Sequence, residues 1–408
     1  MTYDVDAIRA HFPALSAGWV HFDSPGGTQT PRAVGQAIAD VLTGPLSIRG
    51  RRSPSERTAD DAVTEFRSAM ADLLGADPLG IVYGRSATQL IYDFSRHLSR
   101  DWAAGDEVVV SRLDHDANIR PWVQAAARTG ATVVWVDFDP ATGELPAAAV
   151  AAVLTDRTRL VAVTAASNLI GTRPPLAEIA TAVHAAGALM FVDGVHYTAH
   201  AHVDLAALGA DFFVCSPYKF FGPHCGVLAA DPALLAGIHP DKLLPSTDVV
   251  PERFELGTLP YETLAGVTAA VDFIAGLGAL AGGVPSRPTI SRRERLLISQ
   301  RSVQAHEDAL RDRLEAGLGA LPGVTLYSRA AERTATSLVG FAGLPAASAA
   351  DHLAERSILA PAGSFYALAA SRHLGLGEDG ALRIGLAPYS TTAEVDALLA
   401  GIAGFVSG

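Results

Sequence analysis

Short apolar runs that end in polar residues recur along the first half of the chain. They occupy residues 81–83, 107–110, 132–136, 160–164, 188–192 and 212–215, and segments long enough for helices separate them. Strands that are apolar throughout and alternate with helices are typical of a mostly parallel sheet with both faces covered. Helices are expected from Thr30–Pro31 to about Thr43, and from Ala62 to Leu74 with Gly75 as its cap.

The second half of the chain has a different pattern. Residues 276–292 are rich in Gly, Pro and Ser and indicate a boundary, while the glycines of 277–284 predict a poor helix. Beyond it we expect helices at 292–318, at 347–356 and from 392, and strands at 324–327, 337–341 and 382–386. We therefore predict an N-terminal segment (1–20) that packs on the small domain, a large domain (21–275) and a smaller C-terminal α+β domain (276–408).

Polar residues follow the apolar runs of the first half. In open α/β sheets the ligand lies at the carboxyl ends of the strands, so these residues should meet at one edge. The residues concerned are Ser86, His115, Asn168, Asp193, Ser216 and Lys219.

Lys219 lies between the apolar residues 212–215 and 220–221. A buried lysine loses its proton readily, and the neutral amine is a nucleophile that can form a Schiff base with a carbonyl cofactor such as pyridoxal 5'-phosphate (PLP). A strand-end lysine with its ammonium group in water explains the same stretch equally well.

Composition excludes several classes of protein. Of 408 residues, 49% are hydrophobic and the net charge is -12, which argues for a large core and against general binding to nucleic acid or anionic membranes. The two cysteines, Cys215 and Cys225, provide no disulfide framework, and no metal site is predicted. No secretory signal and no run of about 18 purely apolar residues is found, so we expect a cytoplasmic protein without a membrane span.

A PLP site requires a few parts, and the polar strand ends could supply them. Asp193 could pair with the pyridine nitrogen, or cap a helix. His115 could stack on the ring, or be an ordinary strand-end histidine. Asn168 could bind the phenolic oxygen, or close an Asx turn. Arg383 could bind a substrate carboxylate, or lie half-buried at a sheet edge.

The phosphate of such a cofactor needs hydroxyl and amide donors at the start of a helix, where the helix dipole favours an anion. The segment Gly84–Thr88, with Ser86, Ala87 and Thr88, offers both kinds of donor before a predicted helix. Simple capping of that helix is the alternative.

Motifs along nearly the whole chain resemble the class V aminotransferase family of fold-type I PLP enzymes, in its cysteine-desulfurase-like branch. They are residues 21–27 (HFDSPGG), 114–122 (DHDANIRPW), 167–172 (SNLIGT), 192–196 (VDGVH), 216–223 (SPYKFFGP), 255–258 (ELGT) and 383–391 (RIGLAPYST). The resemblance implies a large domain with a mostly parallel, seven-stranded-type sheet covered by helices, and a smaller α+β domain.

The resemblance also implies roles for individual residues. Lys219 would be the Schiff-base lysine, with His115 stacked on PLP and Asp193 on the ring nitrogen as the other catalytic residues. His196 and Tyr218, which replace the family's usual Gln and His, would also contact the cofactor, as would Ser216. Thr258 would reach the phosphate in the neighbouring subunit of a homodimer, and Arg383 with Asn168 would bind the substrate amino acid.

Cysteine desulfurases carry a nucleophilic cysteine on a small-domain loop, and the matching loop here, residues 360–367, has none. We therefore expect a desulfurase-like C–S lyase, acting on cysteine, cystine or a cysteine conjugate, that forms no persulfide there. An amino-acid epimerase or racemase of the isopenicillin-N-epimerase type and an aminotransferase are the alternatives within the family. A non-catalytic PLP-binding protein, or a protein binding another phosphorylated ligand, would belong to a different class.

Overall fold

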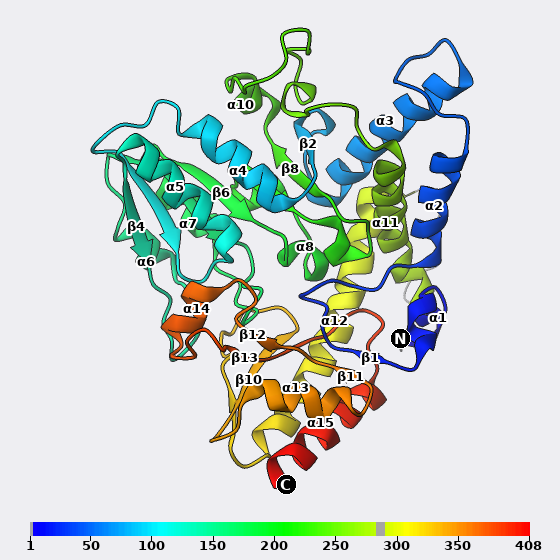
Figure 1. Cartoon of the computed structure of the whole chain (residues 1–408), viewed down its shortest axis with the longest axis vertical. Coiled ribbons are helices and arrows are strands. Elements are labelled where there is room, and N and C mark those ends of the chain that lie inside the picture. The colour runs from blue at the N-terminus through cyan, green and yellow to red at the C-terminus, as the bar shows by residue number, and fades with distance from the viewer. Residues whose placement is uncertain (1–2, 283–289) are drawn as a thin grey trace.

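A seven-stranded sheet forms the centre of the larger unit in the computed structural model, which describes residues 3–282 and 290–408 (Figure 1). Its strands, in spatial order, are β2 (Ile81–Gly84), β8 (Gly226–Ala230), β7 (Phe212–Cys215), β6 (Leu189–Asp193), β5 (Thr158–Thr164), β3 (Glu107–Ser111) and β4 (Thr132–Val136). β8 pairs antiparallel with both its neighbours, and the other pairings are parallel. The predicted mostly parallel α/β sheet is confirmed.

Helices cover both faces of this sheet, which explains why its strands are apolar throughout. On one face, α4 (Ala87–Leu98) and α5 (Arg120–Thr129) pack with Phe191, Phe212 and Val214. The opposite face, which carries Val192 and Phe213, packs against α3 (Pro54–Leu74), α7 (Leu176–Ala185) and α11 (Tyr261–Leu280). Alternate strand residues thus enter different cores, and neither set can be polar.

Two predictions about helices were wrong, namely the start of the helix that ends at Leu74 and the poor helix expected from residue 277. α3 begins at Pro54 rather than near Ala62, because Ser53 and Glu56 form a capping box that starts the helix earlier. α11 continues through Gly276 and Gly278 to Leu280, so the glycines do not end it there. Gly278 lies where α11 meets α12 (Arg292–Gly319), and its amide donates to Ser299 Oγ at 2.8 Å. Of the predicted boundary segment, residues 283–289 lie outside the described residues.

α11 is long and apolar enough to cross a membrane, by length and composition alone. In this fold it packs against α2 (Arg32–Thr43), α3 and α12, and just over half of its most apolar window is buried (56%). Packing inside the protein therefore accounts for its apolar sequence.

The smaller unit is built on a four-stranded antiparallel sheet in the order β12 (Ala362–Gly363), β13 (Ala381–Gly385), β10 (Thr336–Phe341) and β9 (Val324–Leu326). It packs with α12, α13 (Ala346–Ala354) and α15 (Thr392–Ser407), and α14 (Leu368–His373) precedes β13. Figure 1 shows this unit, in orange and red, at one end of the molecule, with α12 leading into it from the larger unit.

The N-terminal segment contacts the smaller unit. β1 (Val20–His21) pairs in parallel with β11 (Ile358–Leu359), and Arg9, at the end of α1 (Val5–Arg9), forms an ion pair of 2.9 Å with Glu394. The boundaries at 20/21 and 275/276 remain our proposal for the domain division, and the second of them falls within α11.

A buried ion pair fixes α3 to the sheet. Arg67 donates to the carbonyl oxygen of Ile81 at 3.0 Å and to Glu255 at 2.8 Å, and the Glu255 carboxylate accepts the Tyr83 amide at 2.9 Å. Burial raises the pKa of Glu255, so this carboxylate depends on its hydrogen bonds to stay charged.

We expect Arg67→Ala to lower the free energy of unfolding by about 3–5 kcal/mol, because it leaves a buried carboxylate without its cation. Arg96→Ala is the matched control: its half-exposed ion pair with Asp93 on α4 should be worth less than about 1 kcal/mol. Chemical denaturation of both variants measures the difference, and equal losses would contradict the importance of the buried pair.

Candidate active site

A cavity of ≈ 380 Å³ lies at the carboxyl edge of the large sheet, facing β13 of the smaller unit. Of the residues predicted from the sequence, it brings together Ser86, Ala87, Thr88, His115, Asn168, Asp193, His196, Ser216, Tyr218, Lys219 and Arg383. Thr258 lies apart from them, exposed in a groove shared with Tyr83 and Arg85. Its predicted reach into a neighbouring subunit therefore remains a proposal.

Lys219 is carried by a short 3-10 helix (Pro217–Phe220) in the turn between β7 and the reversed strand β8. The turn closes through Phe221, whose φ is 73°, and Gly222, where a Cβ would lie 2.7 Å from Pro217. The lysine is buried, and its Nζ donates to the carbonyl oxygen of Pro25. Its contacts are therefore inside the protein rather than with bulk water.

The pKa of Lys219 is lowered from 10.5 to about 7. Burial is the main cause and the positive charge of Arg383 adds to it, while Asp23 and Asp193 act in the opposite direction. Near neutral pH a substantial fraction of this amine is therefore unprotonated and nucleophilic.

Asp193 ends β6 and is buried at the cavity. One carboxylate oxygen accepts the Val195 amide at 2.9 Å, so the capping contact considered from the sequence is present. Among the described residues, no cation forms an ion pair with the carboxylate, and burial raises its pKa to about 6. The other oxygen thus remains available to a positively charged group in the cavity.

His115 follows β3 and is held in a neutral state. Its Nδ1 accepts the Ala117 amide at 3.0 Å, and its ring stacks on Tyr366 with centroids 5.6 Å apart. Burial, followed by the charge of Lys219, lowers its pKa to about 4. A neutral aromatic ring facing the cavity is suited to stacking on a flat ligand.

The motif around His115 is anchored by residues that we assigned no role from the sequence. Asp114 accepts hydrogen bonds from Asn118 at 2.7 Å and from the Thr164 amide at 3.0 Å, and Asn118 accepts one from Trp122 at 3.2 Å. Burial raises the pKa of Asp114 to about 8. These contacts fix the loop after β3 to the neighbouring strand β5 and so position His115.

The N-terminus of α4 points its donors at the cavity. Ser86 caps it by accepting the Gln89 amide at 3.1 Å, while among the described residues no protein acceptor is found for the amides of Ala87 and Thr88. A Cβ on Gly226 would lie 2.3 Å from the Ser86 carbonyl carbon, so only glycine lets β8 approach this turn. The helix end offers free amides and hydroxyls to an anion.

Arg383 crosses from β13 into the cavity and is 2% exposed. It donates to Asp23 at 2.7 Å and to the carbonyl oxygen of Asn168 at 3.1 Å, and its guanidinium lies 3.7 Å from the centroid of the Phe365 ring. Asn168 in turn donates to the Phe365 carbonyl oxygen at 2.9 Å. The guanidinium is thus oriented, and an internal carboxylate neutralises it.

Asp23 and Phe365 were given no role of their own from the sequence. Asp23 lay in the 21–27 motif, which we read only as a turn near the cofactor. Phe365 lay in a loop without a recognisable motif. An acidic residue within the motif was the one signal that could have indicated a partner for an arginine.

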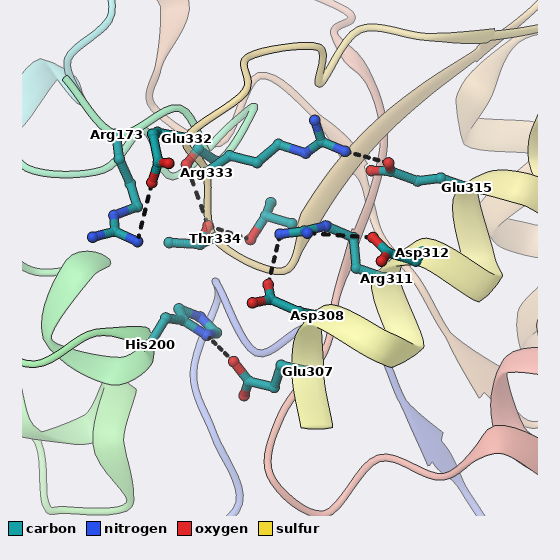
Figure 2. Close-up of polar contacts among 12 residues, drawn as sticks. Arg173, His200, Glu307, Asp308, Arg311, Asp312, Glu315, Glu332, Arg333 and Thr334 are labelled. Carbon is teal, nitrogen blue, oxygen red and sulfur yellow. Dashed lines mark hydrogen bonds and ion pairs between the residues drawn. The ribbon is translucent and has the colours of Figure 1, made fainter. Parts of the chain in front are cut away.

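His196 also lines the cavity. Its Nε2 lies 2.9 Å from Thr334 Oγ1 and 3.0 Å from Thr336 Oγ1, and its ring meets His200 edge-on at 4.8 Å. Figure 2 shows Glu307, on α12, turned toward His200, and their side chains are 2.8 Å apart. Nearby on the same helix, Arg311 pairs with Asp308 at 2.8 Å. The cavity therefore rests on polar contacts between the two units.

The fold and this arrangement define an enzyme class, the fold-type I PLP enzymes, with a lysine and an aspartate at strand ends. The family model of class V aminotransferases matches residues 20–282 and 295–398, and the chain belongs to that family, whose members are PLP-dependent enzymes.

Individual relatives extend over almost the full length. An uncharacterized protein of Mycobacterium tuberculosis is 35% identical over 99% of both chains, and a probable cysteine desulfurase of Pseudomonas aeruginosa is 31% identical over 95% of both. The crystal structure of the cysteine desulfurase CsdA of Escherichia coli matches with a TM-score of 0.86 at 26% identity, covering 100% of this chain and 99% of that one.

The residues in the cavity fit PLP. Among the described residues no cation pairs with the buried carboxylate of Asp193, and a protonated ring nitrogen would supply one. His115 offers a flat face for the ring. The free amides of α4, with the hydroxyls of Thr88 and Ser216 at the same cavity, suit a phosphate.

The pH dependence of PLP capture by the apoprotein should report the pKa of Lys219. We expect the rate of covalent capture to rise with pH and to level off above about 7, because only the neutral amine reacts. Arg383→Met should move the midpoint to higher pH, since a positive charge that lowers the pKa is removed. Asp23→Asn should move it to lower pH.

The change in absorbance after mixing measures these rates. Borohydride reduction followed by peptide mass analysis locates the bond. PLP itself ionises identically in the three experiments, so differences between midpoints belong to the protein. Shifts of the two variants in the same direction would contradict the assigned electrostatics.

Proposed function

We propose that this protein is a PLP-dependent C–S lyase that acts on cysteine, cystine or a cysteine conjugate. The observation that carries the proposal is the meeting, in one cavity, of an amine with a pKa of about 7, an unpaired buried carboxylate and an oriented arginine. The relatives described as cysteine desulfurases support chemistry at a carbon–sulfur bond.

When bound, PLP supplies a carbonyl that joins the substrate amine and a ring that accepts electrons. Lys219 would hold the cofactor and, once released by the substrate, accept the α-proton on its Nζ. Asp193 would balance the positive charge of the ring nitrogen. His115 would cover one face of the ring and exclude water from it.

Arg383 would bind the α-carboxylate of the substrate. Its Nε is buried and has no hydrogen-bond partner among the described residues, and one of its terminal nitrogens donates a hydrogen bond to Asp23. A substrate carboxylate would use the remaining donors or displace Asp23, and either arrangement aligns Cα with Lys219.

The sulfur would leave without forming a covalent bond to a cysteine of the protein. Cys215 and Cys225 are both buried, burial raises the pKa of both thiols, that of Cys225 to about 12, and neither lies on the 360–367 loop. As Lys219 accepts the α-proton, the C–S bond would break and the sulfur would keep the electron pair of that bond, leaving as sulfide from cysteine, as a persulfide from cystine or as a thiolate from a conjugate. Water then hydrolyses the remaining three-carbon enamine to pyruvate and ammonium.

Assays with cysteine, cystine and S-substituted cysteines should release equal amounts of pyruvate and of sulfide, persulfide or thiol. Lys219→Ala should lower turnover by about 10²–10⁴-fold, because it removes the base. The double variant Cys215→Ala/Cys225→Ala, the matched control, should retain turnover to within about threefold, a change of less than ~0.7 kcal/mol in the barrier.

Other results would identify the alternatives. Exchange of the α-proton for deuterium without sulfur release would support an epimerase, and a 2-oxo acid that retains the side chain would support an aminotransferase. Protein that binds PLP but turns over no substrate would support a non-catalytic role.

We also propose a homodimer in which Thr258 completes the partner's phosphate site. Thr258 is exposed, as are nearby Leu256 (66%) and, on other surface segments, Ile48 (69%) and Val249 (61%). Exposed apolar side chains of this size suit an interface between subunits.

Mixed dimers test the shared site. Thr258→Val should weaken PLP binding by about 10-fold or more, the worth of one hydrogen bond to a charged group. When Thr258→Val and Lys219→Ala chains are refolded together, the mixed dimer should bind PLP tightly at one site. That site combines the intact Lys219 of one subunit with the intact Thr258 of the other. No restoration, or a monomer by light scattering at full activity, would contradict the proposal.

A further inference from the structure

The loop at the cavity mouth holds two consecutive residues in a strained backbone conformation. Phe365 and Tyr366 have φ values of 51° and 59°, in the left-handed region that side chains other than glycine rarely adopt. Each such residue costs free energy and persists only where surrounding contacts enforce it.

Both backbone carbonyls of this pair are held by residues of the large unit. The Phe365 oxygen accepts Asn168 Nδ2 at 2.9 Å, and the Tyr366 oxygen accepts the Asp116 amide at 2.7 Å. The donors follow two different strands, β5 and β3, so the loop is fixed at two separate points of the cavity rim.

The strain places two aromatic rings at the cavity. The Phe365 ring lies against the guanidinium of Arg383, at 3.7 Å, and the Tyr366 ring stacks on His115. Tyr366 is 77% exposed, so burial of its ring does not repay the strain. A ligand that covered the exposed ring would remove its apolar surface from water and so offset the strain.

We propose that Phe365 and Tyr366 form an apolar subsite for a group attached to the substrate's sulfur, so that the preferred substrate is a cysteine S-conjugate with an aryl or alkyl substituent. This inference rests on the proposed function. Arg383 would hold the α-carboxylate beside Phe365, which places the β-sulfur within reach of the loop. The thiol of free cysteine is too small to cover either ring.

The rest of the mouth agrees with this assignment. Pro361, Ala117 and Val195 also line the cavity and present apolar surface. Removal of apolar surface from water is favourable, so an aryl group placed between these side chains gains binding free energy. The resemblance matches residues 360–367 to the cysteine-bearing loop of cysteine desulfurases. In this chain that loop would instead provide apolar side chains that contact the substituent.

The test compares S-benzylcysteine, S-methylcysteine and cysteine by thiol and pyruvate release. In the wild type, kcat/KM should increase with the size of the apolar group, by about 10-fold or more from cysteine to S-benzylcysteine. Tyr366→Ala should reduce that ratio by about 10-fold, and Tyr366→Phe should preserve it because the ring remains.

Tyr366→Gly separates the ring from the backbone, since glycine adopts the positive φ without strain. A loss equal to that of Tyr366→Ala assigns the effect to the ring, whereas a wild-type ratio in the glycine variant would overturn the subsite. Trp19→Ala, which removes another exposed aromatic ring (41%) that does not line the cavity, should leave the ratio unchanged.

Binding of carbon analogues, in which a methylene replaces the sulfur, gives a second measurement without turnover. The analogue of S-benzylcysteine should bind about 10-fold more tightly than that of cysteine, and Tyr366→Ala should remove most of the difference. Equal kcat/KM for cysteine and its conjugates overturns this inference alone. Absence of sulfur release from every substrate overturns the proposed function as well.

Discussion

The burial of one lysine amine sets the conditions for the rest of the site. A charged ammonium group buried at the edge of this sheet costs free energy, and this burial lowers the pKa of Lys219 to about 7. Lys219 lies in the tight turn between β7 and β8, and this turn exists because β8 runs antiparallel to β7. A parallel β8 would have required a long crossover connection back to the amino ends of the strands. The antiparallel strand in an otherwise parallel sheet is thus the element that places the Lys219 amine in the cavity.

The N-terminal segment links this amine to the smaller unit. Within four residues, the Pro25 carbonyl oxygen accepts from Lys219, Asp23 pairs with Arg383, and the Phe22 carbonyl oxygen accepts the Gly385 amide at 2.7 Å. A Cβ on Gly385 would lie 2.0 Å from the Pro25 ring, so glycine permits this approach. A movement of the smaller unit would therefore change the positions of both Lys219 and Arg383, because residues 22–25 contact both.

The sequence predicted six of the seven strands because each is an apolar run that ends in polar residues, and all but the edge strand β4 are largely buried. Parallel strands share one carboxyl edge, so the convergence of Asn168, Asp193 and Lys219 followed from topology alone. The ion pair of Asp23 with Arg383 was not predicted, because 360 residues separate its partners and an acidic residue in the 21–27 motif does not by itself indicate which arginine it meets. The conformation of Phe365 and Tyr366 was equally hidden, since neither residue type favours a positive φ and the contacts that impose it come from the large unit.

The charges around the cavity also constrain how an anionic cofactor can be held. Among the described residues that line it, the cationic side chains are Lys219 and Arg383, and both histidines are neutral because burial lowers their pKa. Arg383 already faces Asp23, and Lys219 would lose its charge on joining a carbonyl. A phosphate would then depend on neutral donors: the amides and dipole of α4 and the hydroxyls of Thr88 and Ser216. Such a site has few hydrogen-bond donors, and this supports our proposal that a second subunit supplies one more hydroxyl, that of Thr258.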